Sequence, residues 1–317
     1  MRGCLPPMAT LHEVWVDRGG TFTDCVLRAP EGLRAVKVRS SDAAPLEGIR
    51  RLLGLPADAP IPPCDLRVGT TVATNALLER RHTPTALVVD EGLGDLLAID
   101  DQARPSLFAP WVPRDEPLVT VALEDPSRLG ADGQVLRPVD GEAFRARVAR
   151  AAERHALGAV AIAKLHANRQ PRQERELAAA LDGLGLHVVT SHEVAPTEGL
   201  LGRAHTALAD AALTPALRSY VAFLQEHLPG SRLRFLKSDG GLVDAAGFRG
   251  RDALLSGPAG GVVAVAATAR AARAARVLGL DMGGTSTDVC RWDGEHERRR
   301  ESRVGPARVR APMLAVH

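Results

Sequence analysis

Two short stretches of the chain combine carboxylates, paired glycines and threonines in the same order. Asp17-Arg-Gly-Gly-Thr-Phe-Thr-Asp24 and Asp281-Met-Gly-Gly-Thr-Ser-Thr-Asp288 share the pattern D-x-G-G-T-x-T-D. Paired glycines permit positive φ and let backbone N–H groups approach an anion, because no Cβ stands in the way. Threonine hydroxyls can donate hydrogen bonds to the same anion. Each stretch is therefore a candidate phosphate-binding turn, although a tight hairpin that needs two glycines would have the same sequence.

The aspartates that open the two stretches indicate a cation. A carboxylate that faces phosphate oxygens needs a cation between them, and Mg²⁺ held partly through water is the simplest choice. Asp17 and Asp281 are therefore predicted as catalytic and metal-binding residues. The residues predicted to bind the phosphates of a nucleotide are Gly19, Gly20, Thr21, Thr23, Gly260, Gly261, Gly283, Gly284, Thr285 and Thr287. Because the pattern occurs twice, we expect the two turns to face each other across a cleft.

Short apolar runs on either side of each stretch predict how the turns are positioned. The first stretch lies between apolar residues 14–16 and 25–27, and the second between 277–280 and 289–290. The order of strand, glycine turn and strand predicts two β-hairpins. Apolar residues 158–164 predict a buried strand, followed by a helix from Pro171 and a further strand, which together form a parallel βαβ unit.

Polar residues outside the hairpins are candidate substrate contacts. They are Thr70, Thr71, Asn75, Arg104, Lys237 and Asp239. The first three lie where a strand at 66–68 gives way to a helix whose N-terminus could contact an anion, with Thr71 as a plausible cap. The others lie on a polar loop at 100–104 and in a glycine turn at 237–241. Helix capping, a solvated loop and an Asp-Gly turn explain the same residues without a ligand.

Lys164 and His166 follow the predicted buried strand. Open α/β sheets bind ligands at the carboxyl ends of their strands, although a histidine there can equally be structural. A break in the pattern at 194–202 predicts a joint between subdomains. A helix is expected over 203–228, with a kink or a restart near Pro215.

Composition restricts the class of protein. The 317 residues are 45% hydrophobic and 25% charged, which is typical of a globular protein large enough for two domains. A formal net charge of +2 disfavours nucleic acid and anionic membrane as partners. Four cysteines without C-x-x-C spacing disfavour a zinc site or a disulfide framework. With neither a signal-peptide core nor a run of about 18 apolar residues, the sequence predicts a soluble cytoplasmic protein.

Five motifs, in order along the chain, resemble the hydantoinase A/5-oxoprolinase family. They are Asp17–Asp24, Gly69–Glu79, Ser238–Leu242, Leu255–Val262 and Asp281–Asp288. Within the family, three segments are more similar to 5-oxoprolinase than to N-methylhydantoinase: the first motif, Gln102–Arg104 and Arg203–Thr206. The resemblance implies an α/β, actin-like ATPase (ribonuclease H-like) fold, with the first lobe complete and the second lobe truncated. It divides the chain into a tail (1–10), an N-terminal domain with the first hairpin (11–195) and the start of a hydantoinase A domain with the second hairpin (196–317).

The same resemblance implies an activity. It is ATP-dependent opening of a small cyclic amide, with 5-oxo-L-proline and its product L-glutamate as the leading candidate, ATP and Mg²⁺ as cofactors, and a hydantoinase B-type domain or subunit as partner. The rest of the A domain would follow residue 317, and its absence leaves apolar residues 304–309 as an open edge. Alternatives are a subunit of a related ATP-dependent carboxylase or an N-methylhydantoinase, or a non-catalytic nucleotide-binding fragment of the actin/Hsp70 kind. P-loop, H-E-x-x-H and G-x-S-x-G motifs do not occur.

Overall fold

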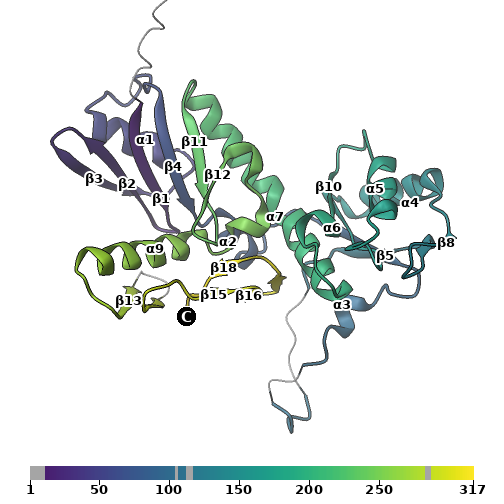
Figure 1. The fold of residues 1–317 in the computed structure, drawn as a ribbon. Helices are drawn as coiled ribbons and strands as arrows, with labels where there is room; N and C mark the ends of the chain where they lie inside the picture. The colour runs from purple at the N-terminus through teal and green to yellow at the C-terminus, as the bar shows by residue number, and fades with distance from the viewer. Residues whose placement is uncertain (1–10, 104–105, 112–116, 283–286) are drawn as a thin grey trace, which may run out of the picture.

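A six-stranded sheet is the centre of the part of the molecule that carries the first hairpin (Figure 1). The computed structural model describes residues 11–103, 106–111, 117–282 and 287–317. The strand order is β12-β11-β4-β1-β2-β3. Strands β1, β4 and β11 run parallel, while β2, β3 and β12 run antiparallel to their neighbours. The bounds are β1 His12–Arg18, β2 Phe22–Ala29, β3 Gly32–Arg39, β4 Cys64–Thr70, β11 Arg232–Leu236 and β12 Leu242–Asp244.

A separate parallel sheet, in the order β10-β9-β5-β6, forms the second body (Figure 1). Its strands are β5 Thr85–Asp90, β6 Val121–Asp125, β9 Ala159–Ile162 and β10 His187–Thr190. The predicted βαβ unit is confirmed, since β9 pairs in parallel with β10 through a connecting helix. The helices of this body are α3 Leu96–Ile99, α4 Gly141–His155, α5 Arg172–Ala180 and α6 Ser191–Val194, and a small ribbon is formed by β7 Arg128–Leu129 and β8 Val135–Arg137.

Helix α7, Leu200–His227, connects the two bodies (Figure 1). It packs against β5, β9 and β10 of the four-stranded sheet and against α2 of the other body. The predicted restart at Pro215 is wrong, because the helix continues through that residue. Leu213 and Leu217 on either side of the proline are fully buried. This packing stabilises the helix despite the hydrogen bond that proline cannot donate.

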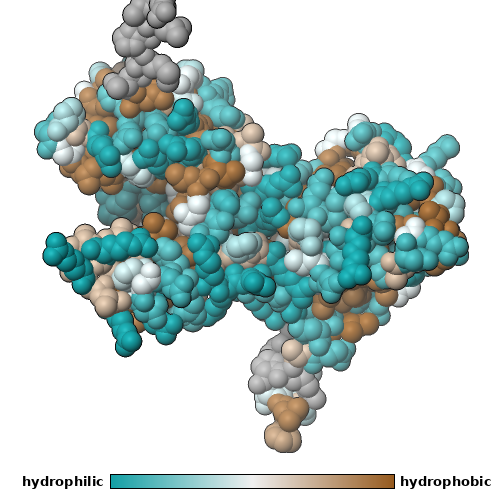
Figure 2. All heavy atoms as spheres, in the orientation of Figure 1, coloured by the Kyte–Doolittle hydropathy of each residue, from teal (hydrophilic) through white to brown (hydrophobic). Residues whose placement is uncertain are grey.

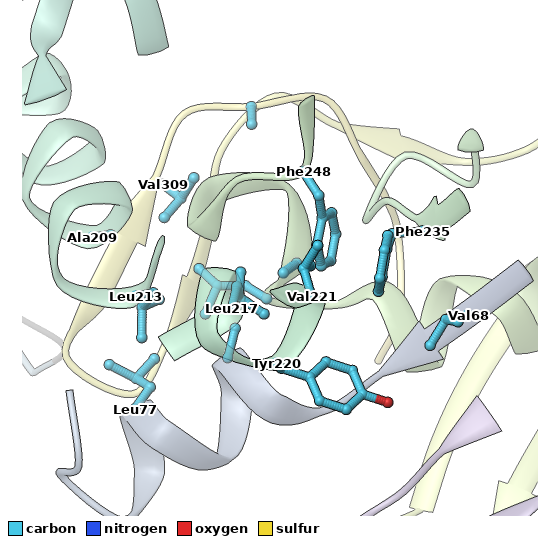
Figure 3. Close-up of a cluster of buried hydrophobic side chains, with 14 of the residues drawn as sticks. Val68, Leu77, Ala209, Leu213, Leu217, Tyr220, Val221, Phe235, Phe248 and Val309 are labelled. Atoms are coloured by element: carbon cyan, nitrogen blue, oxygen red, sulfur yellow. The ribbon is translucent and has the colours of Figure 1, made fainter. Parts of the chain in front are cut away.

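The main hydrophobic core extends along α7 from the six-stranded sheet to the four-stranded sheet. Figure 3 shows Leu217 and Tyr220 of α7 near Phe235 of β11 and Val68 of β4. Phe235 stacks on Phe248, with ring centroids 4.7 Å apart. Apolar burial of this kind contributes about 1.5–3 kcal/mol for each large side chain.

The predicted boundary at 195/196 does not separate the two sheets. Strand β11 lies beyond that boundary, yet it pairs in parallel with β4, so residues from both predicted domains share one sheet. The apolar faces of the two strands explain the pairing, because Leu66, Val68 and Phe235 are fully buried. The four-stranded sheet is therefore an insertion between strands of the first sheet, which a division along the sequence cannot describe.

The remaining elements cover the first sheet and carry the second hairpin. Their bounds are α1 Ala44–Leu53, α2 Val72–Leu78, the 3₁₀ turn η1 Ala245–Gly247, α8 Gly250–Ala253, α9 Ser256–Ala271, β13 Val277–Met282, β14 Thr287–Trp292, β15 Arg298–Arg299, β16 Ser302–Val304, β17 Ala307–Val309 and β18 Met313–Leu314. In the described residues the expected open edge at 304–309 is covered in part: β16 and β17 form a two-stranded sheet, while Ala307 and Val309 are buried where β17 packs on α7. Large exposed apolar side chains occur instead on β13, where Leu278 is 75% exposed and Met282 is 72% exposed.

Elsewhere the surface carries both hydrophilic and hydrophobic residues. Figure 2 shows mainly hydrophilic residues on the face that it presents, with hydrophobic residues in smaller groups between them. Among the described residues, none of the helices combines the length and the apolar character needed to cross a membrane.

Helix α1 fits against β2 only because residue 48 is glycine. A Cβ at Gly48 would lie 2.3 Å from the Sγ atom of Cys25, which is fully buried. We expect Gly48→Ala to lower the free energy of unfolding by about 1–3 kcal/mol, as overpacking does, measured by urea denaturation. Gly141→Ala in α4 is the matched control, because its Cβ would meet Ala180 at an ordinary 3.4 Å. Equal stabilities of the two variants would contradict the close packing.

Candidate nucleotide-phosphate site

Both predicted hairpins are present. In the first hairpin β1 pairs with β2, and Asp17 lies opposite Asp24. In the second hairpin β13 pairs with β14, and Asp281 lies opposite Asp288. The two copies of the motif therefore place their aspartates at equivalent positions of two antiparallel ladders. Three predicted phosphate contacts and one predicted substrate contact lie outside the described residues: Gly283, Gly284, Thr285 and Arg104.

The two hairpins come close enough for their charges to interact. The pKa of Asp17 is raised, first by burial, then by the carboxylates of Asp24 and Asp281, while Lys37 acts in the opposite direction. The pKa of Asp288 is raised by burial and by Asp281. The side chain of Asp17 keeps contact with solvent at one edge of the crowded site. Carboxylates gathered in this way repel one another, so a cation between them would be favourable.

The first turn requires glycine for space. Gly19 N–H donates to the carbonyl of Phe22 at 3.1 Å, and a Cβ at position 19 would lie only 2.9 Å from that oxygen. Gly20 lies beside the Asn75 side chain, whose Nδ2 would be 3.8 Å from an added Cβ. Neither glycine adopts positive φ, so the prediction based on backbone freedom is wrong for this turn. The requirement is for close approach.

One predicted phosphate contact, Thr23, is turned into the protein. Its hydroxyl is fully buried and lies 3.0 Å from the Ser40 hydroxyl, which donates to the Gly19 carbonyl at 2.8 Å. The structure contradicts the prediction for Thr23, because a buried hydroxyl cannot reach a ligand in the cleft. Thr23 and Ser40 instead stabilise the turn through these hydrogen bonds on its buried side. Thr21 and Thr287 are exposed and remain available to a ligand.

The segment that joins β4 to α2 supports the first hairpin. Thr71 donates to the carbonyl of Arg18 through both its N–H and its hydroxyl, each at 3.0 Å. The prediction that its side chain caps α2 is therefore wrong. The buried hydroxyl of Thr70 accepts from Val72 N–H at 3.2 Å, which contradicts a direct substrate contact by Thr70. Asn75 donates to the Thr71 hydroxyl at 3.3 Å, so these two side chains lie at the edge of the turn.

Helix α9 runs from the first hairpin to the second (Figure 1). At its start the Ser256 hydroxyl donates to the carbonyl of Thr70 at 2.8 Å. Farther along, Gly261 has open space where a Cβ would be, and it lines a pocket of about 50 Å³ together with Asp281 and Asp288. Gly260 faces the other way, since a Cβ there would lie 3.1 Å from the Leu236 side chain. The structure therefore places Gly261 beside the second hairpin and uses Gly260 for packing.

Lys237 and Asp239 lie in a turn that positions α9. Their side chains form an ion pair at 2.7 Å. Burial opposes ionisation of Asp239, but hydrogen bonds from Lys237 and from Gly241 N–H lower its pKa overall. Between them, the Ser238 hydroxyl accepts from Leu255 N–H at 3.1 Å and so holds the entry to the helix. Within the described part of the chain, no recorded contact joins this pair to Asp17 or Asp281.

Sequence reasoning missed the residues that orient the first hairpin. The Arg18 guanidinium lies over the ring of Tyr220 in α7, 4.6 Å from its centroid, and forms an ion pair with Asp42 at 2.7 Å. Lys37 on β3 forms an ion pair with Asp24 at 2.7 Å. Each contact joins segments that are distant in sequence. Arg18 occupies a variable position of the motif, so its residue type alone does not indicate a role.

A magnesium ion fits this arrangement only as one shared with a ligand. Within residues 11–103, 106–111, 117–282 and 287–317, no three His, Cys, Asp or Glu side chains are grouped to hold a metal. Mg²⁺ is usually bound by one or two carboxylates together with phosphate oxygens and water. The mutually repelling carboxylates of Asp17 and Asp281 match that requirement.

The mixed sheet and its two equivalent hairpins define an α/β protein with an ATPase-type fold. The nucleotide-free structure of acetone carboxylase shares the fold, with a TM-score of 0.84 at 18% identity over 97% of this chain and 48% of that one. Two family models describe nearly all of the sequence: the hydantoinase/oxoprolinase N-terminal region matches residues 13–185, and hydantoinase/oxoprolinase matches 203–317. The chain belongs to the hydantoinase/oxoprolinase family.

Two relatives indicate the range of activities in this family. 5-Oxoprolinase 1 of Arabidopsis thaliana is 36% identical over 95% of the chain and 27% of its own length. The alpha subunit of caprolactamase from Pseudomonas jessenii is 30% identical over 96% of the chain and 47% of its own length. The crystal structure of that ATP-dependent caprolactamase matches with a TM-score of 0.79 at 28% identity. The chain thus spans about a quarter to a half of the length of these relatives.

Proposed function

We propose that this chain binds the phosphates of Mg-ATP between its two hairpins and supplies the ATP-dependent part of a cyclic amide hydrolase. The observation that carries the proposal is the interaction of Asp17 with Asp281, two equivalent residues of a repeated motif brought together by the fold. Thr21 and Thr287 are exposed on the two hairpins, and Gly261 leaves open space beside Asp281 and Asp288. 5-Oxo-L-proline is the proposed substrate, because the 5-oxoprolinase relative is similar over 95% of the chain.

The chemistry follows from the poor reactivity of a lactam. A bond forms between the γ-phosphorus of ATP and the lactam carbonyl oxygen while the bond from that phosphorus to ADP breaks. A first water adds to the activated carbon, and its C–N bond breaks, which leaves the acyl phosphate of the open amino acid. A second water then cleaves the acyl phosphate and releases phosphate and the free carboxylate. Mg²⁺ would neutralise charge on the phosphates, and positioning supplies most of the catalysis of phosphoryl transfer. In this scheme Asp17 and Asp281 orient the ion, while Thr71 and Asn75 hold the first turn.

The hydrolytic step is assigned to a partner. Caprolactamase has a subunit named alpha, which supports a multi-subunit enzyme, and we propose a hydantoinase B-type domain or subunit for the present chain as well. Cytoplasm is the proposed compartment, since Cys25, Cys64 and Cys290 are buried free thiols of the kind that a reducing environment maintains.

The test is ATP hydrolysis by the chain assembled with its B-type partner. We expect phosphate release to rise when 5-oxo-L-proline is added and to require Mg²⁺. Stimulation by acetone with bicarbonate instead would favour a carboxylase subunit, for which the shared fold with acetone carboxylase is the supporting observation. Failure of the folded chain to bind Mg-ATP in calorimetry would reject the phosphate site itself.

A further inference from the structure

A cavity of about 330 Å³ opens in the second body, at the carboxyl ends of β5 and β9. Its lining includes Leu165, His166 and Asn168, which follow β9, and Gly199, Leu200 and Arg203 at the start of α7. After β5 the chain adds β6 on one side of that strand and then crosses to β9 on the other side. Open α/β sheets bind ligands at such a switch point, outside the carboxyl ends of the strands.

A buried guanidinium lines this cavity without an anionic partner. Arg203 is 2% exposed, and its recorded acceptors are all uncharged: the Ser191 hydroxyl at 3.2 Å, the Asn168 side-chain oxygen at 3.3 Å, the Thr197 carbonyl at 3.4 Å and the Lys164 carbonyl at 2.6 Å. Among the described residues, no carboxylate lies within ion-pair distance of it. A buried charge is costly unless it is paired.

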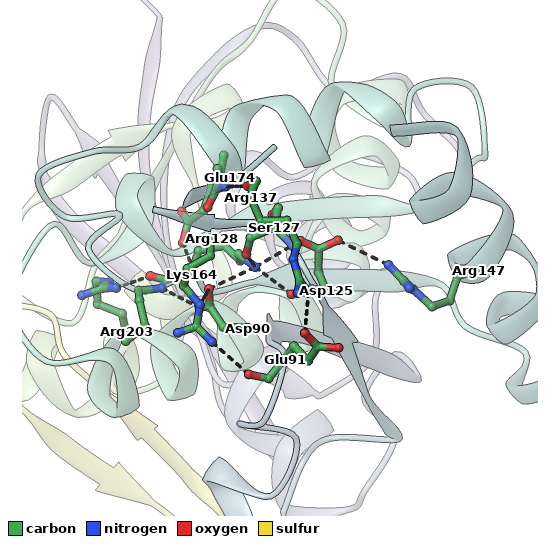
Figure 4. Close-up of polar contacts among 12 residues, drawn as sticks. Asp90, Glu91, Asp125, Ser127, Arg128, Arg137, Arg147, Lys164, Glu174 and Arg203 are labelled. Atoms are coloured by element: carbon green, nitrogen blue, oxygen red, sulfur yellow. Dashed lines mark hydrogen bonds and ion pairs between the residues drawn. The ribbon is translucent and has the colours of Figure 1, made fainter. Parts of the chain in front are cut away.

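The neighbouring carboxylates are already engaged (Figure 4). Glu174 accepts from Lys164 N–H at 2.9 Å, from the Ser191 hydroxyl at 2.5 Å and from His192 N–H at 2.9 Å. Asp90 pairs with the ammonium group of Lys164 at 3.2 Å. Burial therefore remains the largest influence on Arg203 and lowers its pKa, although Glu174 and Asp90 oppose that from a distance.

The cavity is also lined by the start of helix α7 and by His166, Arg169 and Glu198. Helix α7 has 28 residues, and its N-cap position is Gly199, which has no side chain to accept from the first N–H groups. Those groups and the helix dipole favour an anion. Arg310 approaches the same end and donates to the Glu198 carbonyl at 2.8 Å. Glu198 points its carboxylate to Arg169 at 2.5 Å, so this acid does not neutralise Arg203.

We propose that this cavity binds a small organic carboxylate. Its carboxylate would lie between Arg203 and the first turn of α7, and its carbon skeleton would contact Leu165 and Leu200. The site is separate from the phosphate site, because the first hairpin contacts α7 at Tyr220, and twenty residues of helix span about 30 Å. The proposal therefore stands independently of the proposed reaction.

Calorimetry of the chain with three probes tests the proposal. We expect 5-oxo-L-proline and acetate to bind and 2-pyrrolidone, the same lactam ring without its carboxylate, not to bind. Arg203→Gln should weaken binding of the acids at least about tenfold, equivalent to about 1.4 kcal/mol. Leu200→Trp, which fills the cavity and leaves Arg203 in place, should do the same if Arg203→Gln does not fold.

Two control variants separate this site from other effects. Arg172→Gln removes an exposed guanidinium of α5 that pairs with Glu176, and Asp17→Asn alters the phosphate site; both should bind the acids as the parent chain does. Equal binding of 2-pyrrolidone, absence of binding by both acids, or unchanged affinity in a folded Arg203→Gln or Leu200→Trp variant would overturn the proposal. Loss of acid binding in Asp17→Asn would also overturn it, because the ligand would then occupy the phosphate site.

Discussion

Replacing Asp17 by asparagine is expected to weaken Mg-ATP binding about 100-fold without weakening the fold at neutral pH. Loss of a charged partner at a desolvated contact costs about 2–5 kcal/mol of binding free energy. In the folded chain without ligand the Asp17 carboxylate is instead unfavourable, because partial burial and the carboxylates of Asp24 and Asp281 raise its pKa. The neutral amide removes that unfavourable charge. Calorimetric titration with Mg-ATP and thermal unfolding, both at pH 7, measure the two effects.

The raised pKa of Asp17 also predicts the direction in which stability changes with pH. Folding raises the pKa of Asp17 above its ordinary value of 3.8, so the native state binds the proton more tightly than the unfolded state does. The favourable contribution is complete below the unfolded pKa and is lost as pH rises through the raised native pKa. Between pH 4 and pH 7 the Tm of the parent chain should therefore fall relative to that of Asp17→Asn.

The control for this variant is Asp58→Asn on an exposed loop. It should leave Mg-ATP affinity unchanged, and its Tm should follow that of the parent at every pH. A Tm of Asp17→Asn that drops below the parent value at pH 7, together with unchanged nucleotide affinity, would show that Asp17 is an ordinary structural residue.

Lys164→Met is expected to lower the free energy of unfolding by about 3–5 kcal/mol, the usual cost of breaking a buried ion pair. Lys164 is 1% exposed, and its ammonium group lies 3.2 Å from Asp90 and 3.1 Å from Asp125 (Figure 4). It also donates to the Ser127 carbonyl at 2.9 Å. Without the lysine, the two buried carboxylates would keep only their longer ion pairs, Asp90 with Arg128 at 3.7 Å and Asp125 with Arg147 at 3.3 Å. Urea denaturation followed by circular dichroism measures the loss.

Two further variants make the Lys164 prediction specific. Arg172→Met removes the exposed partner of Glu176 and should cost at most about 1 kcal/mol, as surface pairs do. Adding Asp125→Asn to Lys164→Met should recover part of the lost stability, since one of the stranded charges is then removed. A loss below about 1 kcal/mol in Lys164→Met would mean that water or a rearranged side chain replaces the ammonium group.

The hairpins could be predicted because their determinants are local. Apolar runs, a glycine pair and a repeated eight-residue pattern lie within a few residues of one another, and the observed registers place Asp17 and Asp281 at equivalent positions. Helix α1 was predictable for the same reason, since Leu46, Ile49 and Leu52 recur at helical spacing and are buried. The fold class was implied by the resemblance to the hydantoinase A/5-oxoprolinase family, which rests on equally local motifs.

Roles that depend on distant segments could not be predicted in this way. The two-residue period places Thr21 and Thr23 on one face of a strand, yet Thr23 is buried because Ser40, from the end of β3, covers it. Thr71 supports Arg18 in place of capping its own helix. That strands from both predicted domains share one sheet could not be predicted either, because β11 pairs with β4, far away in sequence.

By itself the sequence determined the two hairpins, the alternation of strands and helices, and the family resemblance, because each depends on residues close together in the chain. Only the tertiary structure decided that Asp17 and Asp281 share one electrostatic environment, and that Lys164 is neutralised while Arg203 lines a cavity without a carboxylate partner. Burial and charge compensation depend on which segments pack together. These contacts are set by the whole hydrophobic core and not by local spacing.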